Sequence, residues 1–187
     1  MTDTKANLQA KVQRRIVVTL IFGTSIAYIA WVYYPFDAPK DPTLVNRLVF
    51  TLRWLVLSML PIIFGVKLVA DVRFHNMDTA GVMTTTQYAE QLVRLKQRAL
   101  QNTLEQTALH VPIMLIFSTY VDSNHLKLVP IVICMFNLGR IIFFIGYLAT
   151  GDQFNRAFGF VLTFFSNVIP VVYCLYRLFV SGASYGI

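Results

Sequence analysis

Residues 98–120 read RALQNTLEQTALHVPIMLIFSTY, a polar beginning that runs without a break into an apolar stretch. Arg98, Asn102 and Glu105 are spaced four and three residues apart, which places all three on one face of a helix. A charged side chain in the centre of a membrane costs roughly 3 kcal/mol on insertion scales, so such groups turn inward and find partners. The stretch therefore predicts a membrane helix with one polar, inward-facing side.

The composition of the chain also indicates a membrane protein. Of its 187 residues, 56% are hydrophobic and 13% are charged, whereas a soluble domain carries about 25% charged residues. The net charge of +7 comes from lysines and arginines that cluster beside the apolar segments, a distribution that orients a protein in a membrane. We therefore expect an all-α integral membrane protein that contacts the lipid bilayer and binds no nucleic acid.

Five apolar segments are long enough to cross a hydrocarbon core, which takes about 20 helical residues. They are residues 16–34, 48–70, 99–120, 126–149 and 157–180. Residues 1–15 form a polar tail, residues 35–47 a proline-containing connector, and residues 181–187 a second tail. The first segment has no small-residue cleavage site, so we expect it to be a retained span and not a signal peptide.

Lysines and arginines are unevenly divided between the two sides of the membrane. If the five spans alternate in direction, ten of these residues lie on the side of the N terminus, whereas three, Lys40, Arg47 and Lys127, lie on the other side. Because positive charge is retained in the cytoplasm, the asymmetry predicts a cytoplasmic tail 1–15, a cytoplasmic connector 71–98 and a lumenal connector 35–47.

Polar side chains recur in later spans. Residues 137–147 read NLGRIIFFIGY, with Arg140 and Tyr147 at helical spacing, and Arg156 opens the last span. In one interpretation Glu105 pairs with Arg140 or Arg98, forming a structural ion pair that fixes the register of a bundle. In the other, the arginines converge on a pocket for an anionic ligand, because a guanidinium fork suits a carboxylate.

The cysteines and histidines indicate no further site. Cys134 and Cys174 lie within apolar runs, where we expect small buried or lipid-facing side chains. His75, His110 and His125 are widely separated and are expected at the surface or the membrane interface, because a metal site needs converging ligands.

The motif of Arg98, Asn102 and Glu105, together with NLGRIIFFIGY in a later span, resembles the MAPEG family, the membrane-associated proteins of eicosanoid and glutathione metabolism. The resemblance covers residues 48–180. It implies a four-helix membrane bundle that assembles as a homotrimer, with glutathione held between subunits at the cytoplasmic side. The segment 16–34 would then be an extra transmembrane helix that precedes this bundle.

The resemblance also implies roles for individual residues. The positions that match glutathione-contacting residues of the family are Arg98, Asn102, Glu105, Arg140 and Tyr147. Arg156 matches the arginine that stabilises the thiolate in catalytic members, and Lys67 or Arg73 matches a companion basic residue loosely.

Three positions depart from the catalytic members. Phe143 and Gln106 stand where relatives carry tyrosine, and Leu100 stands where they carry histidine or glutamine. Each lost hydrogen bond to a polar ligand is worth about 0.5 to 1.5 kcal/mol. Two or three such losses would weaken glutathione binding by about one to three orders of magnitude.

The stretch RAFGFVLTFFSNVIP at residues 156–170 is similar to the mattrin branch of that family, which also has an extra leading span. This implies a protein of ER, Golgi or lysosome-type endomembranes that is non-catalytic or weakly catalytic. Its role would be interaction or regulation, in secretory organelles or in Wnt signalling through Frizzled-type receptors. The alternative is a membrane glutathione transferase or peroxidase that joins glutathione thiolate to lipophilic electrophiles.

Overall fold

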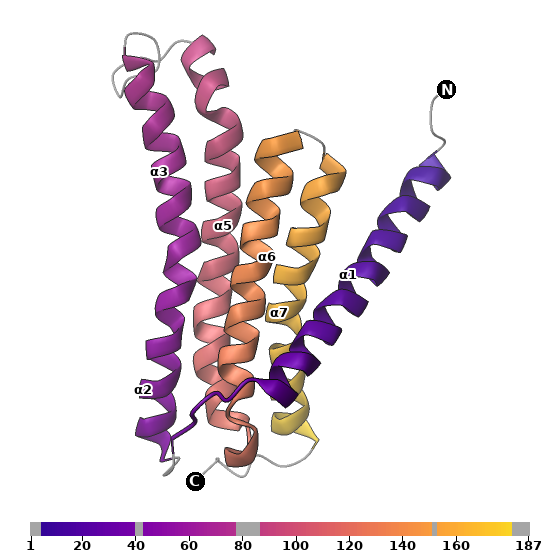
Figure 1. The fold of residues 1–187 in the computed structure, drawn as a ribbon, viewed down its shortest axis with the longest axis vertical. Coiled ribbons are helices and arrows are strands. Elements are labelled where there is room, and N and C mark those ends of the chain that lie inside the picture. Colours follow the sequence, from indigo (N-terminus) through magenta and orange to yellow (C-terminus); the bar gives the residue numbers. More distant parts are fainter. Residues whose placement is uncertain (1–4, 40–42, 78–86, 151–152, 181–187) are drawn as a thin grey trace.

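The computed structural model describes residues 5–39, 43–77, 87–150 and 153–180, and within these ranges the chain is helical with no strand. The elements are α1 (Lys5–Tyr33), α2 (Leu44–Leu55), η1 (Val56–Met59), α3 (Leu60–His75), α5 (Gln87–Tyr120), η2 (Ser123–His125), α6 (Leu128–Thr150) and α7 (Gln153–Phe179). Helices α2 and α3 form one continuous rod through η1, and this rod packs with α5, α6 and α7 as a bundle (Figure 1).

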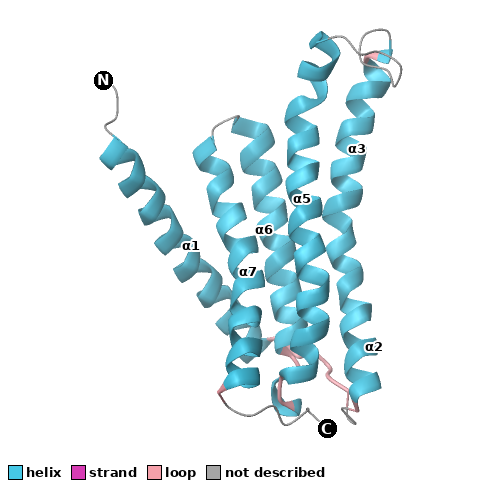
Figure 2. Cartoon of the chain, turned by 180° about the vertical axis from the view of Figure 1, so that it is seen from behind, coloured by secondary structure: helices cyan, strands magenta, loops and turns pink. Residues whose placement is uncertain are grey.

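Within the described ranges, four helical segments have the length and composition of membrane spans: Val12–Tyr33, Leu44–His75, Ser123–Leu148 and Ala157–Phe179. Helix α5 has 34 residues and runs beside these segments. It is not one of the four because its polar side chains make it less apolar than a membrane span. Together the helices confirm the expected all-α membrane bundle with one additional N-terminal helix. Below, the upper end of the bundle is the end at which α3 ends and α5 begins, and the lower end is the opposite one (Figure 2).

The short 3-10 turn η1 is explained by Pro61. Proline has no N–H, so it cannot donate to the carbonyl of Leu57 four residues earlier, as an α-helix requires. Leu60 donates its backbone N–H to this carbonyl instead, which is the tighter hydrogen-bonding pattern of a 3-10 turn. The rod can therefore pass through Pro61 without leaving that carbonyl unsatisfied.

The tightest helix contact joins α6 to α7 through two glycines. A Cβ atom built on Gly139 would lie 2.9 Å from the backbone nitrogen of Thr163, and one on Gly159 would lie 2.6 Å from the carbonyl oxygen of Gly139. Only residues without a side chain allow two helix backbones to approach this closely. This crossing brings Thr163 of α7 beside Arg140 of α6.

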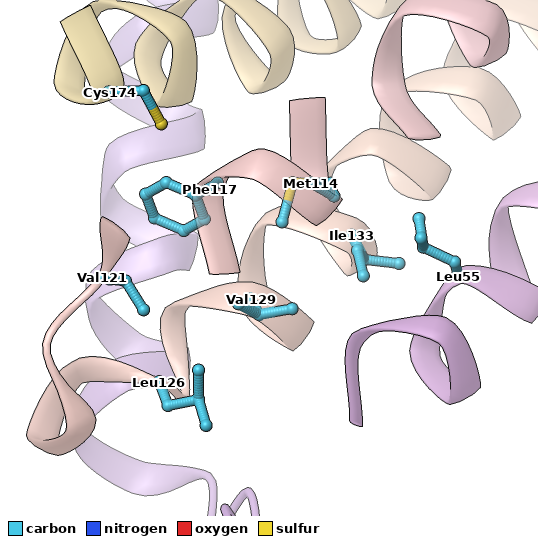
Figure 3. Close-up of a cluster of buried hydrophobic side chains, with 8 residues drawn as sticks. All are labelled: Leu55, Met114, Phe117, Val121, Leu126, Val129, Ile133 and Cys174. Atoms are coloured by element: carbon cyan, nitrogen blue, oxygen red, sulfur yellow. The ribbon is translucent and has the colours of Figure 1, made fainter. Parts of the chain in front are cut away.

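A cluster of buried apolar side chains closes the lower end of the bundle (Figure 3). The cluster contains side chains from α2, α5, α6 and α7 and from the connection between α5 and α6. They are Leu55, Met114, Phe117, Val121, Leu126, Val129, Ile133 and Cys174. Cys174 is 8% exposed and belongs to this core, whereas Cys134 is half-buried.

Helix α1 leans away from the bundle, so that its N-terminal half stands apart from α7 (Figures 1 and 2). Its C-terminal half packs on α6 and α7, with Phe22 against Phe158 of α7, and its Trp31 stacks on His125 of η2. The Lys127 ammonium donates to the carbonyl of Trp31 at 2.8 Å and lies 3.9 Å from the centre of its ring. Lys127 therefore caps the C terminus of α1.

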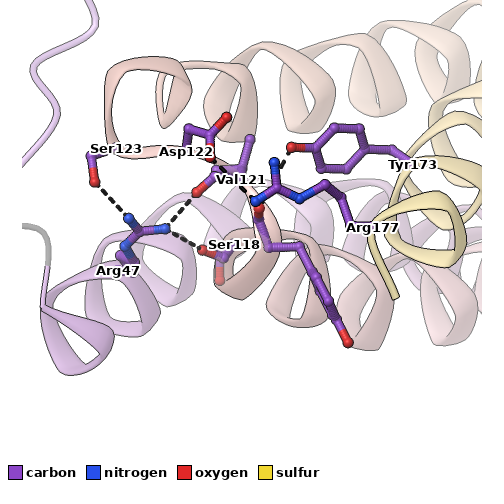
Figure 4. Close-up of polar contacts among 8 residues, drawn as sticks. Arg47, Ser118, Val121, Asp122, Ser123, Tyr173 and Arg177 are labelled. Atoms are coloured by element: carbon purple, nitrogen blue, oxygen red, sulfur yellow. Dashed lines mark hydrogen bonds and ion pairs between the residues drawn. The ribbon is translucent and has the colours of Figure 1, made fainter. Parts of the chain in front are cut away.

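Arg47 has the same role at the lower end of α5 (Figure 4). Its guanidinium is 2% exposed and donates to the carbonyl oxygens of Ser118 and Val121 and to the hydroxyl of Ser123. Two of the three cations assigned to this side of the membrane, Arg47 and Lys127, are thus bound to helix carbonyls. Positive charge is expected to be scarce on this side of the membrane. These two cations are stable there because each lies at the negative C-terminal end of a helix dipole. The third, Lys40, lies outside the described residues.

Replacing Arg47 by Met should destabilise the fold. The apolar stem would be kept, but buried carbonyl oxygens at the end of α5 would lose their donors, at a cost of about 1–3 kcal/mol. A lower melting temperature of the detergent-solubilised protein would show the loss, with Arg53→Met, an exposed arginine of α2, as the control. Equal melting of the two variants would contradict a capping role for Arg47.

Candidate functional site

Arg140 lies halfway along α6, and its side chain is fully buried. Its Nε donates to the hydroxyl of Thr163 on α7 at 3.0 Å, and its Nη1 donates to the amide oxygen of Asn102 on α5 at 3.0 Å. Thr163 in turn donates to the carbonyl of Gly159 at 2.8 Å, so its hydroxyl accepts from one side and donates to the other. Arg140 therefore joins three helices at the level of the glycine crossing.

The second terminal nitrogen of Arg140, Nη2, is buried and has no hydrogen-bond partner in the described part of the chain. No carboxylate of the described residues forms an ion pair with this guanidinium; the ion pair at 3.4 Å between Arg177 and Asp122 lies at the lower end. An uncompensated buried charge costs several kcal/mol. The geometry is that of a cation with one terminal nitrogen, which carries two N–H donors, left over for an anion.

Aromatic rings cover one side of Arg140. The centre of the guanidinium lies 4.4 Å from the ring centre of Phe143, one turn above it on α6. The ring of Tyr147 stacks on that of Phe143 with the ring centres 5.4 Å apart, and Tyr147 is 8% exposed. Asn102, Arg140 and Tyr147, three of the five residues expected to contact glutathione, are thus gathered in one region.

The other two, Arg98 and Glu105, are exposed on the outer face of α5. The Glu105 carboxylate accepts a hydrogen bond from the amide of Gln101 at 3.0 Å. Within the residues that the structure describes it pairs with neither Arg98 nor Arg140, so the structural ion pair considered from the sequence is not formed. Arg94, Arg98, Gln101 and Glu105 instead form an exposed polar stripe, called below the α5 polar face.

The basic residues considered for thiolate stabilisation are not assembled with Arg140. The side chain of Arg156, in the first turns of α7, lies outside the described part of the chain. Arg73 borders an apolar pocket of about 420 Å³ between α3 and Leu100 of α5. Lys67 is exposed on α3.

A second buried polar cluster was missed by the sequence analysis. His110, expected at the surface or interface, is fully buried and stacks on Phe136 at 3.9 Å. Its Nδ1 lies 2.8 Å from the amide oxygen of Asn167, whose amide nitrogen donates to Gln106 at 3.3 Å. Because Asn167 presents its oxygen, His110 must donate through Nδ1. Gln106 is therefore part of the packing between α5 and α7.

Comparison with known proteins gives one family and named relatives. A family model described as "MAPEG family" matches residues 51–176. Transmembrane protein 79 of Mus musculus is 30% identical over 167 residues, which cover 88% of this chain and 41% of that protein. Transmembrane protein 79 of Bos taurus is 30% identical over 168 residues, which cover 86% of this chain and 39% of that protein. The chain thus spans about two fifths of the length of these relatives, and no solved structure matches.

Proposed function

The chain belongs to the MAPEG family, and we propose that it retains a glutathione pocket around Arg140 while acting mainly as a non-catalytic or weakly catalytic interaction and regulatory protein of endomembranes. Its similarity to transmembrane protein 79 supports the second half of this proposal. Partners such as Frizzled-type receptors, and a role in Wnt signalling or secretory organelles, follow as part of the same proposal.

The Nη2 of Arg140, which has no hydrogen-bond partner among the described residues, is the observation that carries the glutathione pocket. A fully buried guanidinium that already binds Thr163 and Asn102 through its other nitrogens is pre-organised to receive a carboxylate. Glutathione has two carboxylates, so the residues present fit this ligand. Arg140 would hold a carboxylate directly, and Asn102 would orient Arg140.

The α5 polar face supports assembly with further copies of the chain. Asn102 lies at the level of Arg140, and Glu105 follows about 4.5 Å further along α5, which places the exposed carboxylate near the middle of the bundle. A carboxylate facing lipid at that depth is unfavourable. We propose that partner copies in a homotrimer cover this face and that Arg98 and Glu105 join the pocket there.

The trimer is testable by mass. Light scattering of the detergent-solubilised protein, corrected for bound detergent, should give three times the 21.3 kDa of one chain. A particle that contains a single folded chain would leave the α5 polar face uncovered and would contradict the assembly.

Phe143 supports the non-catalytic part of the proposal. Its ring, without a hydroxyl, covers the Arg140 guanidinium at 4.4 Å, where catalytic relatives carry a tyrosine. When bound, glutathione would supply a thiol that can attack a lipid-soluble electrophile, but one hydrogen bond to orient it is missing. The alternative function is a glutathione transferase or peroxidase. It would bind glutathione through the same buried arginine, so only a measurement of enzyme activity distinguishes it from the non-catalytic function.

Glutathione conjugation of 1-chloro-2,4-dinitrobenzene by the purified protein distinguishes the two functions. We expect glutathione to bind but turnover to stay close to the spontaneous rate, because the tyrosine hydroxyl is absent at Phe143 and the basic residues Lys67 and Arg73 are not assembled with Arg140 to stabilise a thiolate. Wild-type turnover that disappears in Arg156→Ala would establish the enzyme instead. If neither turnover nor glutathione binding is found, the pocket itself is wrong.

A further inference from the structure

A groove of about 770 Å³ opens between α3 and α6, apart from the Arg140 region. Its walls are side chains of η1 and α3 from Leu57 to Phe64 and of α6 from Cys134 to Leu148, and none comes from α5. Apart from Asn137 and Cys134, the lining side chains are hydrocarbon or aromatic. Asn137 donates its amide to the carbonyl of Ile133 at 2.8 Å, so it already has a partner.

The length of the groove matches an acyl chain. Cys134 and Leu148 are fourteen residues apart on α6, which corresponds to about 21 Å at the helical rise of 1.5 Å per residue. One leaflet contributes about half of the roughly 30 Å hydrocarbon core of a bilayer. The groove is therefore long enough to hold a whole lipid chain along its axis.

Two side chains of opposite charge, Lys67 and Asp71 of α3, lie just beyond the upper end of the groove. Phe64, a lining residue, lies against Phe144 of α6 at 5.2 Å. Lys67 is one helical turn above Phe64, near the level of Tyr147, and Asp71 is one turn above Lys67, near the level at which α6 ends. Both side chains are exposed. Across the described ranges, neither forms an ion pair with the other or with a third residue.

This order of charges is complementary to a zwitterionic phospholipid. In phosphatidylethanolamine the phosphate lies next to the glycerol and the ammonium lies further out, so the lipid presents a negative group nearer the chains and a positive group beyond it. Lys67 is nearer the groove and Asp71 is further out. A primary ammonium also donates hydrogen bonds to a carboxylate, which the quaternary ammonium of phosphatidylcholine cannot do.

We propose that the α3–α6 groove binds one acyl chain of phosphatidylethanolamine from the leaflet at the upper end of the bundle, with the phosphate at Lys67 and the ammonium at Asp71. The site does not rest on the proposed glutathione pocket, because it uses another edge of the bundle. Glutathione binding and lipid binding are therefore separate readouts.

Native mass spectrometry of the full chain in detergent tests the site. Phosphatidylethanolamine, phosphatidylglycerol and phosphatidylcholine with identical acyl chains are added in turn, and the retained lipid is counted per chain. We expect phosphatidylethanolamine to be retained about tenfold more strongly than the other two, since the one charge-assisted hydrogen bond from its ammonium to Asp71, which neither of them can form, corresponds to roughly this ratio. Asp71→Ala should remove the preference, Lys67→Ala should lower the retention of all three lipids because each carries the phosphate, and Arg53→Ala, at an exposed arginine of α2, should change neither.

Blocking the groove provides the second arm. Ile141 lines the groove and is 55% exposed, so Ile141→Trp fills the groove without disturbing the core. This variant should lose the retained lipid, whereas Val172→Trp, at an exposed position of α7, should keep it. Equal retention of the three lipids, stronger retention of phosphatidylglycerol, or retention unchanged in Ile141→Trp would overturn the proposal. A change in the number of chains per particle in Ile141→Trp would show that a second copy occupies the groove.

Discussion

Arg140→Met is expected to remove glutathione binding without weakening the ligand-free protein. Methionine keeps the length of the arginine stem but has no charge to be compensated. Removing an uncompensated buried charge relieves a cost of several kcal/mol, while the Thr163 hydroxyl keeps its bond to Gly159 and the Asn102 oxygen is only partly buried. Arg140 is fully buried with one nitrogen unpartnered in the described part of the chain, so the ligand-free variant should melt at or above the wild-type temperature.

The same variant should lose the rise in melting temperature that glutathione gives to the wild type. Truncating one partner of a buried charge pair costs about 2–5 kcal/mol, which corresponds to a loss of affinity of roughly 30-fold to several thousand-fold. Thermal unfolding with and without glutathione measures both effects, with Arg53→Met as the exposed control. If Arg140→Met melts well below the wild type in the absence of glutathione, Arg140 is a structural residue and the pocket is contradicted.

Gly159→Ala is expected to disrupt the crossing of α6 and α7. The new Cβ would meet the backbone nitrogen and the Cα of Phe143, the latter at 2.6 Å, and the carbonyl of Gly139 at 2.6 Å. Backbone atoms cannot move aside as a side chain can, so the helices must separate. The cost should be at least about 3 kcal/mol, the upper part of the usual range for overpacking. Glutathione binding should fall with it, because Arg140 binds Thr163 at this crossing.

Gly23→Ala is the matched control for this variant. Its Cβ would lie 2.8 Å from Cδ1 of Leu162, which is the end of a flexible side chain and can rotate away. The loss of folded protein, followed by size-exclusion chromatography in detergent, should therefore be large for Gly159→Ala and small for Gly23→Ala. Similar elution of both variants as folded protein would show that the crossing tolerates a side chain.

The helical membrane bundle was predictable from the sequence because apolar segments of sufficient length have few alternatives in a membrane. The bounds differ in physically understandable ways. Residues 48–70 were expected as one span, and the rod extends from Leu44 to His75 with a 3-10 turn before Pro61. The expected segment 99–120 is the lower part of the longer helix α5.

The rotation of α5 could not be predicted. Asn102 and Glu105 were placed on one face by their spacing, but three residues turn a helix by about 300°, which leaves them about 60° apart. That angle directs Asn102 to Arg140 and leaves Glu105 outside. Only the packing of α5 against its neighbours decides which of the two turns inward.

The buried His110 cluster was also beyond sequence reasoning. His110 and Asn167 are 57 residues apart, and neither belongs to a motif. A usable signal was that both polar residues lie within apolar stretches, where an unpaired polar group is costly. That signal could have predicted partners for them, but not that they bind each other.

Titration calorimetry of the purified protein with glutathione, and in parallel with glutathione diethyl ester, tests the central claim most directly. The claim is that Arg140 is a buried cation that has no counterion among the residues the structure describes and that receives a carboxylate. Glutathione should bind and the diethyl ester, which has lost both carboxylate charges, should bind at least tenfold more weakly. Equal affinities for the two compounds, or no binding of glutathione to the wild-type protein, would contradict the account.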